Sequence, residues 1–117
     1  MDNRRKTGLW GEIMAVRYLR DHGYDIINTN FRVGRAEIDI IAADGEQLVV
    51  AEVKTRAPGG LLPAAEAVDR EKRALLLSAG AAVQKIYKAS RPIRYDIIEV
   101  YYADRDDFTV HHIKQAF

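Results

Sequence analysis

Apolar residues in the first part of the 117-residue chain recur with a helical period. Between about Thr7 and His22 they stand three or four residues apart, which predicts an amphipathic helix with one face turned toward the core. The members of this stripe are Leu9, Ile13, Val16 and Leu19. Gly23 follows at the position where helices end in the left-handed conformation.

The rest of the chain reads as strands around one further helix. Residues 24–31 and the two arms of 36–54, which flank the turn signal Asp44-Gly45, are predicted strands. A loop at 56–63 precedes a helix from about Asp69 to Lys88. Strands are predicted at 93–102 and 108–113, with a turn at 103–107 between them and the last strand at an edge. The order α-β-β-β-α-β-β predicts a single mixed α/β domain over residues 1–117.

Charged residues interrupt the predicted hairpin of residues 36–54. With Asp44 and Gly45 as central turn residues, Ala43 pairs with Glu46, Asp39 lies opposite Val50, and Glu37 lies opposite Glu52. Side chains alternate between the faces of a strand. One face then carries Glu37, Asp39, Glu52 and Lys54, and the other carries Ile38, Ile40, Val49, Ala51 and Val53.

A like-charge pair on adjacent strands is unfavourable without a cation. Two or more carboxylates and no cysteine suit magnesium or manganese, which prefer oxygen ligands. The alternative is a solvated hairpin end in which Lys54 pairs with a carboxylate for less than ~1 kcal/mol. Against it, the flanking strands are apolar on both faces, as strands covered by helices on both sides are.

Composition narrows the classes of protein further. Apolar residues make up 48% and charged residues 30%, and no apolar run approaches the ~20 residues of a membrane span. The N-terminal residues lack the apolar segment of a signal peptide, and the absence of cysteine excludes disulfide and thiolate chemistry, so a cytoplasmic location is expected. The net charge of +1 argues against binding nucleic acid by bulk charge alone.

The acid Asp39 on one strand, followed by Glu52-Val53-Lys54 on the next, resembles the signature of the PD-(D/E)XK nucleases, with Ile38 in place of the proline. A wider set of segments resembles the bacterial YraN-like family, which is described as similar to Holliday-junction resolvases. These are GLWGE (8–12), AEIDIIA (36–42), AEVKTR (51–56), AVDREKRALL (67–76), RYDIIEV (94–100) and IKQAF (113–117). Ala36 departs from the glycine usual in that family and leaves the acids in place.

The resemblance implies a restriction-endonuclease-like fold, in which a mixed sheet is flanked by two helices. It also implies a Mg²⁺ or Mn²⁺ site held by Asp39, Glu52, the Val53 carbonyl and Glu12. Lys54 would orient or activate the attacking water. The implied activity is metal-dependent hydrolysis of nucleic acid, with structured or branched DNA as the expected substrate.

Several of these residues have simpler interpretations. Glu12 would also be favoured by the helix dipole, and Lys72 could lie along the apolar face of the second helix. Lys72, Arg56 and Arg73 are predicted to contact nucleic acid within a basic rim that also includes Arg4, Arg5, Lys6 and Arg70. The rival function is a non-catalytic nucleic-acid- or protein-binding module that keeps the fold. An enzyme of this size could also need a homodimer or another partner to grip its substrate.

No histidine is a candidate ligand. His111 and His112 are adjacent in a strand and point to opposite faces, so they cannot chelate together. His22, near the end of a predicted helix, fits compensation of the helix dipole.

Overall fold

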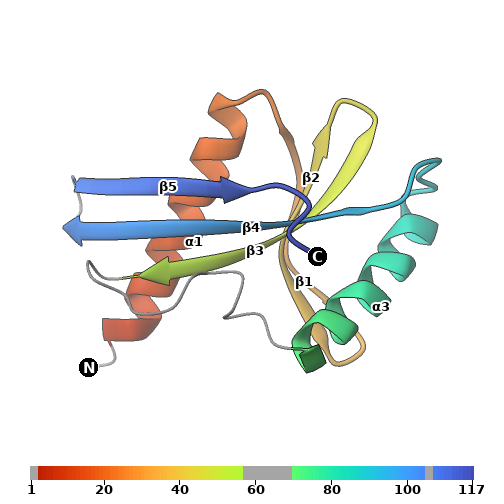
Figure 1. The fold of residues 1–117 in the computed structure, drawn as a ribbon, viewed down its shortest axis with the longest axis horizontal. Coiled ribbons are helices and arrows are strands. Elements are labelled where there is room, and N and C mark those ends of the chain that lie inside the picture. The colour runs from red at the N-terminus through yellow and green to blue at the C-terminus, as the bar shows by residue number, and fades with distance from the viewer. Residues whose placement is uncertain (1–2, 57–69, 105–106) are drawn as a thin grey trace.

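The computed structural model describes residues 3–56, 70–104 and 107–117. The described elements follow the predicted order and confirm the α/β fold class (Figure 1). They are α1 (Asn3–Asp21), β1 (Asp25–Val33), β2 (Ala36–Asp44), β3 (Gln47–Arg56), α3 (Arg70–Ile86), β4 (Arg94–Asp104) and β5 (Asp107–Ile113). The predicted loop at 56–63 lies almost entirely outside the described residues, as does the centre of the predicted turn at 103–107.

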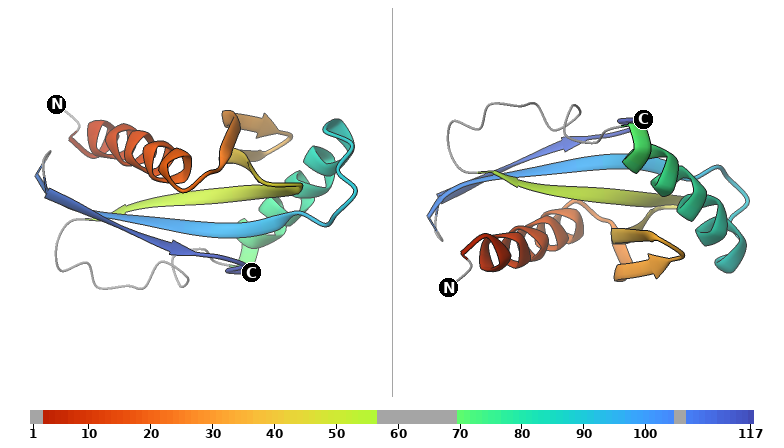
Figure 2. Two further views of the ribbon diagram at one scale, coloured as in Figure 1. Left: turned by 90° about the horizontal axis from the view of Figure 1, so that it is seen from above. Right: turned by 90° about the horizontal axis from the view of Figure 1, so that it is seen from below.

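The five strands form one sheet in the order β1-β2-β3-β4-β5, which places β5 at an edge as predicted. Only β3 and β4 are parallel, and α3 lies in the connection between them, as a parallel pair requires. Helices α1 and α3 lie on opposite faces of the sheet (Figure 2). One apolar cluster packs under α3 and the other under α1, so the central strands are buried on both sides.

The buried face of α1 differs from the predicted stripe. Leu19 of that stripe is buried as predicted, but Leu9 and Ile13 are 56% and 54% exposed, and Met14 and Ala15 are buried in their place. We attribute the rotation to a close approach between the helix and the sheet at Gly11. A Cβ atom there would lie 1.9 Å from Thr55 Oγ1 of β3, so only glycine permits this approach without a shift.

The C-terminus of α1 agrees with the predicted stop at Gly23, whose φ is 85°. The Gly23 amide donates to the Arg20 carbonyl (3.0 Å), and the Tyr24 amide donates to the Leu19 carbonyl (2.9 Å). This pair of bonds is a Schellman motif, which turns the chain sharply into β1.

The predicted register of the β2–β3 hairpin is wrong by two residues. Asp44 pairs with Gln47, so Gly45 and Glu46 are the central turn residues. Gly45 has φ 62° and Glu46 does not have a positive φ, which fits a turn that needs glycine at its first central position. Glu37 therefore does not face Glu52. Because the shift is an even number of residues, it leaves the face of each side chain unchanged.

The two strands also separate within the hairpin. Their last paired residues are Ile40 and Ala51, while β2 continues to Ala36 paired only with β1. In Figure 2 the far end of the β1–β2 ribbon leaves the plane of the other strands. Two-stranded ribbons twist more strongly than wide sheets. As a result Ile38 packs in the cluster under α3 and Ile40 in the cluster under α1, contrary to the prediction that they share one face.

None of the helices in the described part of the chain has both the length and the apolar character needed to cross a membrane.

Candidate functional site

Asp39 lies at the point where β2 separates from β3. Its Oδ2 accepts a hydrogen bond from the backbone amide of Val53, at 2.8 Å. The strands β2 and β3 are no longer paired at this point, so the Asp39 side chain accepts the hydrogen bond that a backbone carbonyl would otherwise accept. The carboxylate is therefore fixed to β3 while its remaining lone pairs face the gap between the strands.

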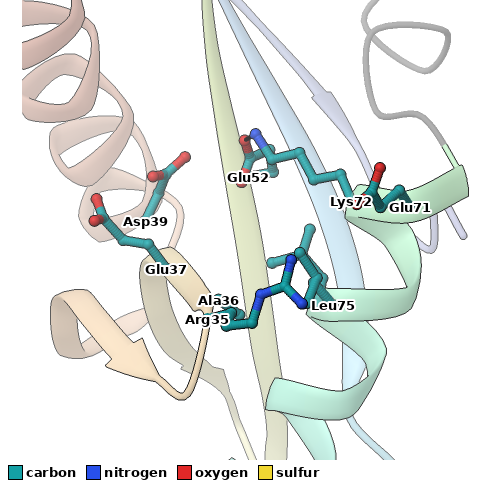
Figure 3. Close-up of a pocket in the computed structure, with 9 residues that line it drawn as sticks. Arg35, Ala36, Glu37, Asp39, Glu52, Glu71, Lys72 and Leu75 are labelled. Carbon is teal, nitrogen blue, oxygen red and sulfur yellow. Dashed lines mark hydrogen bonds and ion pairs between the residues drawn. The ribbon is translucent and has the colours of Figure 1, made fainter.

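A cavity of about 410 Å³ opens beside this gap, between β2, β3 and the first turns of α3. Figure 3 shows Asp39 and Glu37 reaching up from β2 on one side, and Glu52 meeting Lys72 on the other. The charged residues that line it are Arg35, Glu37, Asp39, Glu52, Glu71 and Lys72. The predicted acids of the hairpin therefore converge on one cavity, together with three charged residues from outside β2 and β3.

Glu52 is the most deeply buried of these acids, with only 4% of its side chain exposed. Its Oε1 forms an ion pair with the ammonium of Lys72, from α3. The same oxygen lies 3.4 Å from Lys54 Nζ, two residues further along β3. One carboxylate oxygen thus faces two ammonium groups.

Burial raises the pKa of Asp39, and the neighbouring carboxylates of Glu52 and Glu12 raise it further, to about 7. The hydrogen bond from Val53 and the charge of Lys72 act in the opposite direction and do not offset these effects. Near neutral pH, Asp39 therefore has too few hydrogen-bond donors and cations around it to stabilise its negative charge fully.

The two lysines respond differently to the same acids. Burial lowers the pKa of Lys54, and the nearby Lys72 lowers it further, despite the opposing effect of Glu52. Burial also acts to lower the pKa of Lys72, but the ion pair with Glu52 and the charge of Asp39 outweigh it and raise this pKa. Lys72 is therefore the principal counter-ion of the cluster, and Lys54 holds its proton less tightly than an exposed lysine does.

Glu12 approaches Asp39 from the other side of the sheet. Both residues line a second cavity, of about 590 Å³, between α1 and β1. Burial raises the pKa of Glu12, a hydrogen bond from Asn30 opposes this, and the charges of Glu37 and Glu52 raise it further. The charge of Glu12 therefore interacts with the charges of the hairpin acids, although Glu12 does not line the cavity that contains Glu52.

The donor set suits a hard divalent cation. Mg²⁺ is usually bound through one or two carboxylates, with water and substrate oxygens as its other ligands. Asp39 and Glu52 supply two carboxylates beside an open cavity, and Asp39 is short of donors. In residues 3–56, 70–104 and 107–117, no three acidic or histidine side chains gather closely enough to enclose a metal by themselves. A closed cage such as structural zinc requires is thus not found in these segments.

The predicted nucleic-acid contacts are distributed unevenly. Lys72 lies at the cavity, but the guanidinium of Arg73 is 5.6 Å from the centre of the Phe117 ring. Arg56 lies on β3 with its Nε and Nη2 atoms buried and without a hydrogen-bond partner among the described residues. The side chains of Arg4, Arg5 and Lys6 lie outside the described part of the structure.

Arg35 of the cavity was not predicted from the sequence. It lies just before β2, in the turn that follows Gly34, whose φ is 58°. The only available signal was its position at the end of the hairpin strand that carries Asp39. A charge in a turn is normally solvated, so that signal is weak.

Comparison with known proteins identifies relatives over the whole chain. Residues 11–100 match the model of "Uncharacterised protein family UPF0102". A UPF0102 protein of Bacteroides thetaiotaomicron is 40% identical over 117 residues, covering 100% of this chain and 96% of that protein. A UPF0102 protein of Porphyromonas gingivalis is 39% identical, with 100% and 87% covered. One from Dehalococcoides mccartyi is 43% identical over 99 residues, with 84% and 82% covered.

Proposed function

The chain belongs to protein family UPF0102, and from the geometry of its acidic cavity we propose that it is a metal-dependent nuclease. The proposed reaction is hydrolysis of phosphodiester bonds, with structured or branched DNA as the substrate. The observation that carries the proposal is the convergence of Asp39 and Glu52 on one open cavity, with Lys54 next to Glu52.

Energetic cost supports a functional role for this cluster. A buried carboxylate with a raised pKa and like-charged neighbours destabilises a fold near neutral pH. Such arrangements are concentrated at sites where charge is needed for binding or chemistry. A module that only binds nucleic acid has no use for two acids at its binding cavity, because acids repel phosphates.

Asp39 and Glu52 would hold the metal ion, which when bound would polarise the phosphate and lower the pKa of a water molecule. The hydrogen bond from the Val53 amide fixes the orientation of the Asp39 carboxylate. Lys54 would place positive charge beside the scissile phosphate, where negative charge builds up in the transition state. Its lowered pKa also makes it the lysine best able to exchange a proton with water.

A nuclease panel with matched variants tests the proposal. Labelled single strands, duplexes, flaps and four-way junctions of DNA and RNA would be incubated with Mg²⁺ or Mn²⁺. We expect cleavage of a structured DNA that Asp39→Asn abolishes. Lys54→Met should lower the cleavage rate by about 100-fold or more while changing DNA affinity by less than about threefold. Lys85→Met, in the last turn of α3, is the control with the same change in charge.

Equal losses of cleavage and affinity in Lys54→Met would make Lys54 a phosphate-binding residue. That result, or metal-independent binding with no cleavage of any substrate, would instead favour the non-catalytic binding module.

A further inference from the structure

Lys72 reaches from α3 across the cavity to a carboxylate that belongs to β3. Figure 3 shows its extended side chain lying between the helix and Glu52. The ammonium group forms an ion pair with Oε1 of Glu52, a residue that lines the cavity. Glu52 itself comes from the centre of the sheet and has little freedom to move, because it is buried and its strand is paired with β4.

The two partners differ in how easily they can separate. The side chain of Lys72 is 39% exposed, whereas that of Glu52 is 4% exposed. Lys72 lies in the first turn of α3, and its four-carbon stem can adopt other rotamers over the cavity. A competing cation could therefore displace the ammonium without moving the carboxylate.

We propose that Lys72 is the resident counter-ion of this site, which a divalent metal ion displaces from Glu52 and so releases to bind a phosphate of the substrate. This inference rests on the proposed function and adds a positioning residue to it. The same side chain would stabilise the acids before metal binds and contact the nucleic acid afterwards.

Steric and electrostatic arguments indicate that a metal ion replaces the Lys72 ammonium at Glu52, and that the two cations do not bind there together. A Mg²⁺ ion binds its oxygen ligands at about 2.0–2.1 Å and imposes a fixed geometry on them. An ammonium on the same Oε1 atom would lie within a few ångströms of the divalent charge, with strong repulsion in a partly buried site. Lys54 already lies near that oxygen and is held on β3, so Lys72 is the cation that can leave.

Exchange predicts that metal and nucleic acid bind cooperatively through one side chain. Removing the competing ammonium should tighten metal binding, and it should also remove part of the gain in DNA affinity that metal produces. A lysine that only buttresses the acids would give the opposite sign for metal. A lysine that only binds phosphate would leave metal affinity unchanged.

Calorimetric titration with Mn²⁺ tests the first half of the inference. We expect Lys72→Met to bind Mn²⁺ about tenfold more tightly than the wild type, and Lys85→Met to match the wild type. In the wild type, the ¹⁵N-edited NMR signal of the Lys72 ammonium should be visible without metal and should shift or broaden on saturation with Mg²⁺. Lys72→Met binding that is equal or weaker, or an ammonium signal that Mg²⁺ does not change, would overturn the inference.

Fluorescence anisotropy of a labelled four-way junction, with and without Ca²⁺, tests the second half. Ca²⁺ should raise the affinity of the wild type several-fold more than that of Lys72→Met. An equal gain in both proteins would overturn the release of Lys72 to phosphate. Failure of the proposed function is distinguishable, because then the wild type would bind no Mn²⁺, or Glu52→Gln would bind it as well as the wild type does.

Discussion

Two carboxylates on central strands, Asp39 of β2 and Asp96 of β4, are surrounded in opposite ways. Asp96 is fully buried and accepts bonds from Arg94 (2.8 Å to Oδ2) and the Gln115 amide (3.1 Å), with His112 Nε2 at 2.7 Å. Asp39 accepts one described bond, from the Val53 amide, and its other neighbours include two carboxylates. The first acid is saturated with donors and the second is not.

The pKa values of the two acids express this difference. Burial acts to raise the pKa of Asp96, but the bonds from His112 and Arg94 outweigh it and lower the pKa below its usual range. For Asp39, burial and the charge of Glu52 prevail and raise the pKa to about 7. A buried acid with a full set of partners stabilises the fold, whereas one without them is retained at a cost in stability. The comparison therefore separates a structural acid from a candidate functional one.

The same substitution at both acids should give opposite results, and the larger effect is at Asp96. Asp96→Asn should lower the free energy of unfolding by about 3 kcal/mol at pH 7, because the partly buried Arg94 loses its principal partner inside the protein. Since the pKa of Asp96 is lowered in the folded protein, its contribution is present above the unfolded value of 3.8 and is lost as pH falls through the folded value. Urea titration at pH 7 measures the loss.

Asp44 provides the control for this experiment. It also pairs with Arg94, at 3.0 Å, but its side chain is 43% exposed. Asp44→Asn should therefore cost less than about 1 kcal/mol. Similar losses in both variants would mean that Arg94 needs any acid nearby rather than the saturated Asp96.

Asp39→Asn should stabilise the metal-free protein, with a smaller magnitude and a distinct pH dependence. The pKa of Asp39 is raised from 3.8 to about 7 in the folded state, so the folded protein holds its proton more tightly. Stability is then lost as pH rises between these two values. We expect Asp39→Asn to gain about 1 to 2 kcal/mol at pH 8 in chelator and to differ little from the wild type near pH 4.

Magnesium should narrow or reverse this gap, because only the wild type has the complete ligand pair. At ten times its dissociation constant, a ligand adds about 1.4 kcal/mol to the protein that binds it. Thermal melts at pH 8 in chelator and in Mg²⁺ measure both the gain in stability from Asp39→Asn and the stabilisation of the wild type by the metal ion. A lower melting temperature for Asp39→Asn in chelator would assign Asp39 to the fold and not to a metal site.

The sequence carried enough information to bring the candidate acids together, even though the hairpin register was wrong. The side-chain period of a strand is two, so a shift of two residues changes the partner of Asp39 but not its face. The error arose because Asp-Gly favours a turn in which both residues are central, whereas here Gly45-Glu46 occupy that position. A one-residue error would have turned these acids to the opposite face.

Other features depended on tertiary contacts that no local pattern encodes. The exposed Leu9 and Ile13 follow from the close approach of Gly11 to Thr55, and that contact joins residues 44 positions apart. The saturated environment of Asp96 needs Arg94 beside it and His112 from the neighbouring strand. The sequence predicted that His112 is not a metal ligand, but it gave no indication that His112 contacts Asp96. The acids of β2 and β3 were easier to predict because one hairpin carries them.

The smallest expected effect concerns Glu37, which lines the cavity with Asp39 but is much more exposed to solvent than Glu52. Its side chain is 44% exposed and pairs with Arg32 at 3.1 Å, and Arg32 is itself 79% exposed. An ion pair of this kind contributes little, so Glu37→Gln should change stability by less than about 0.5 kcal/mol. Glu52→Gln, by contrast, removes the largest charge effect on Asp39.

Carboxyl ¹³C NMR of Asp39 provides the measurement that separates the two glutamates. Glu52→Gln should lower the pKa of Asp39 toward its usual range, because it removes the neighbouring negative charge that raises this pKa. Burial would keep that pKa above the usual value, since the cavity walls are unchanged. Glu37→Gln should leave the pKa of Asp39 where it is in the wild type. A drop of equal size in both variants would show that Glu37 acts on Asp39 as strongly as Glu52 does. Exposure to solvent would then not distinguish Glu37 from the acids of the charged cluster.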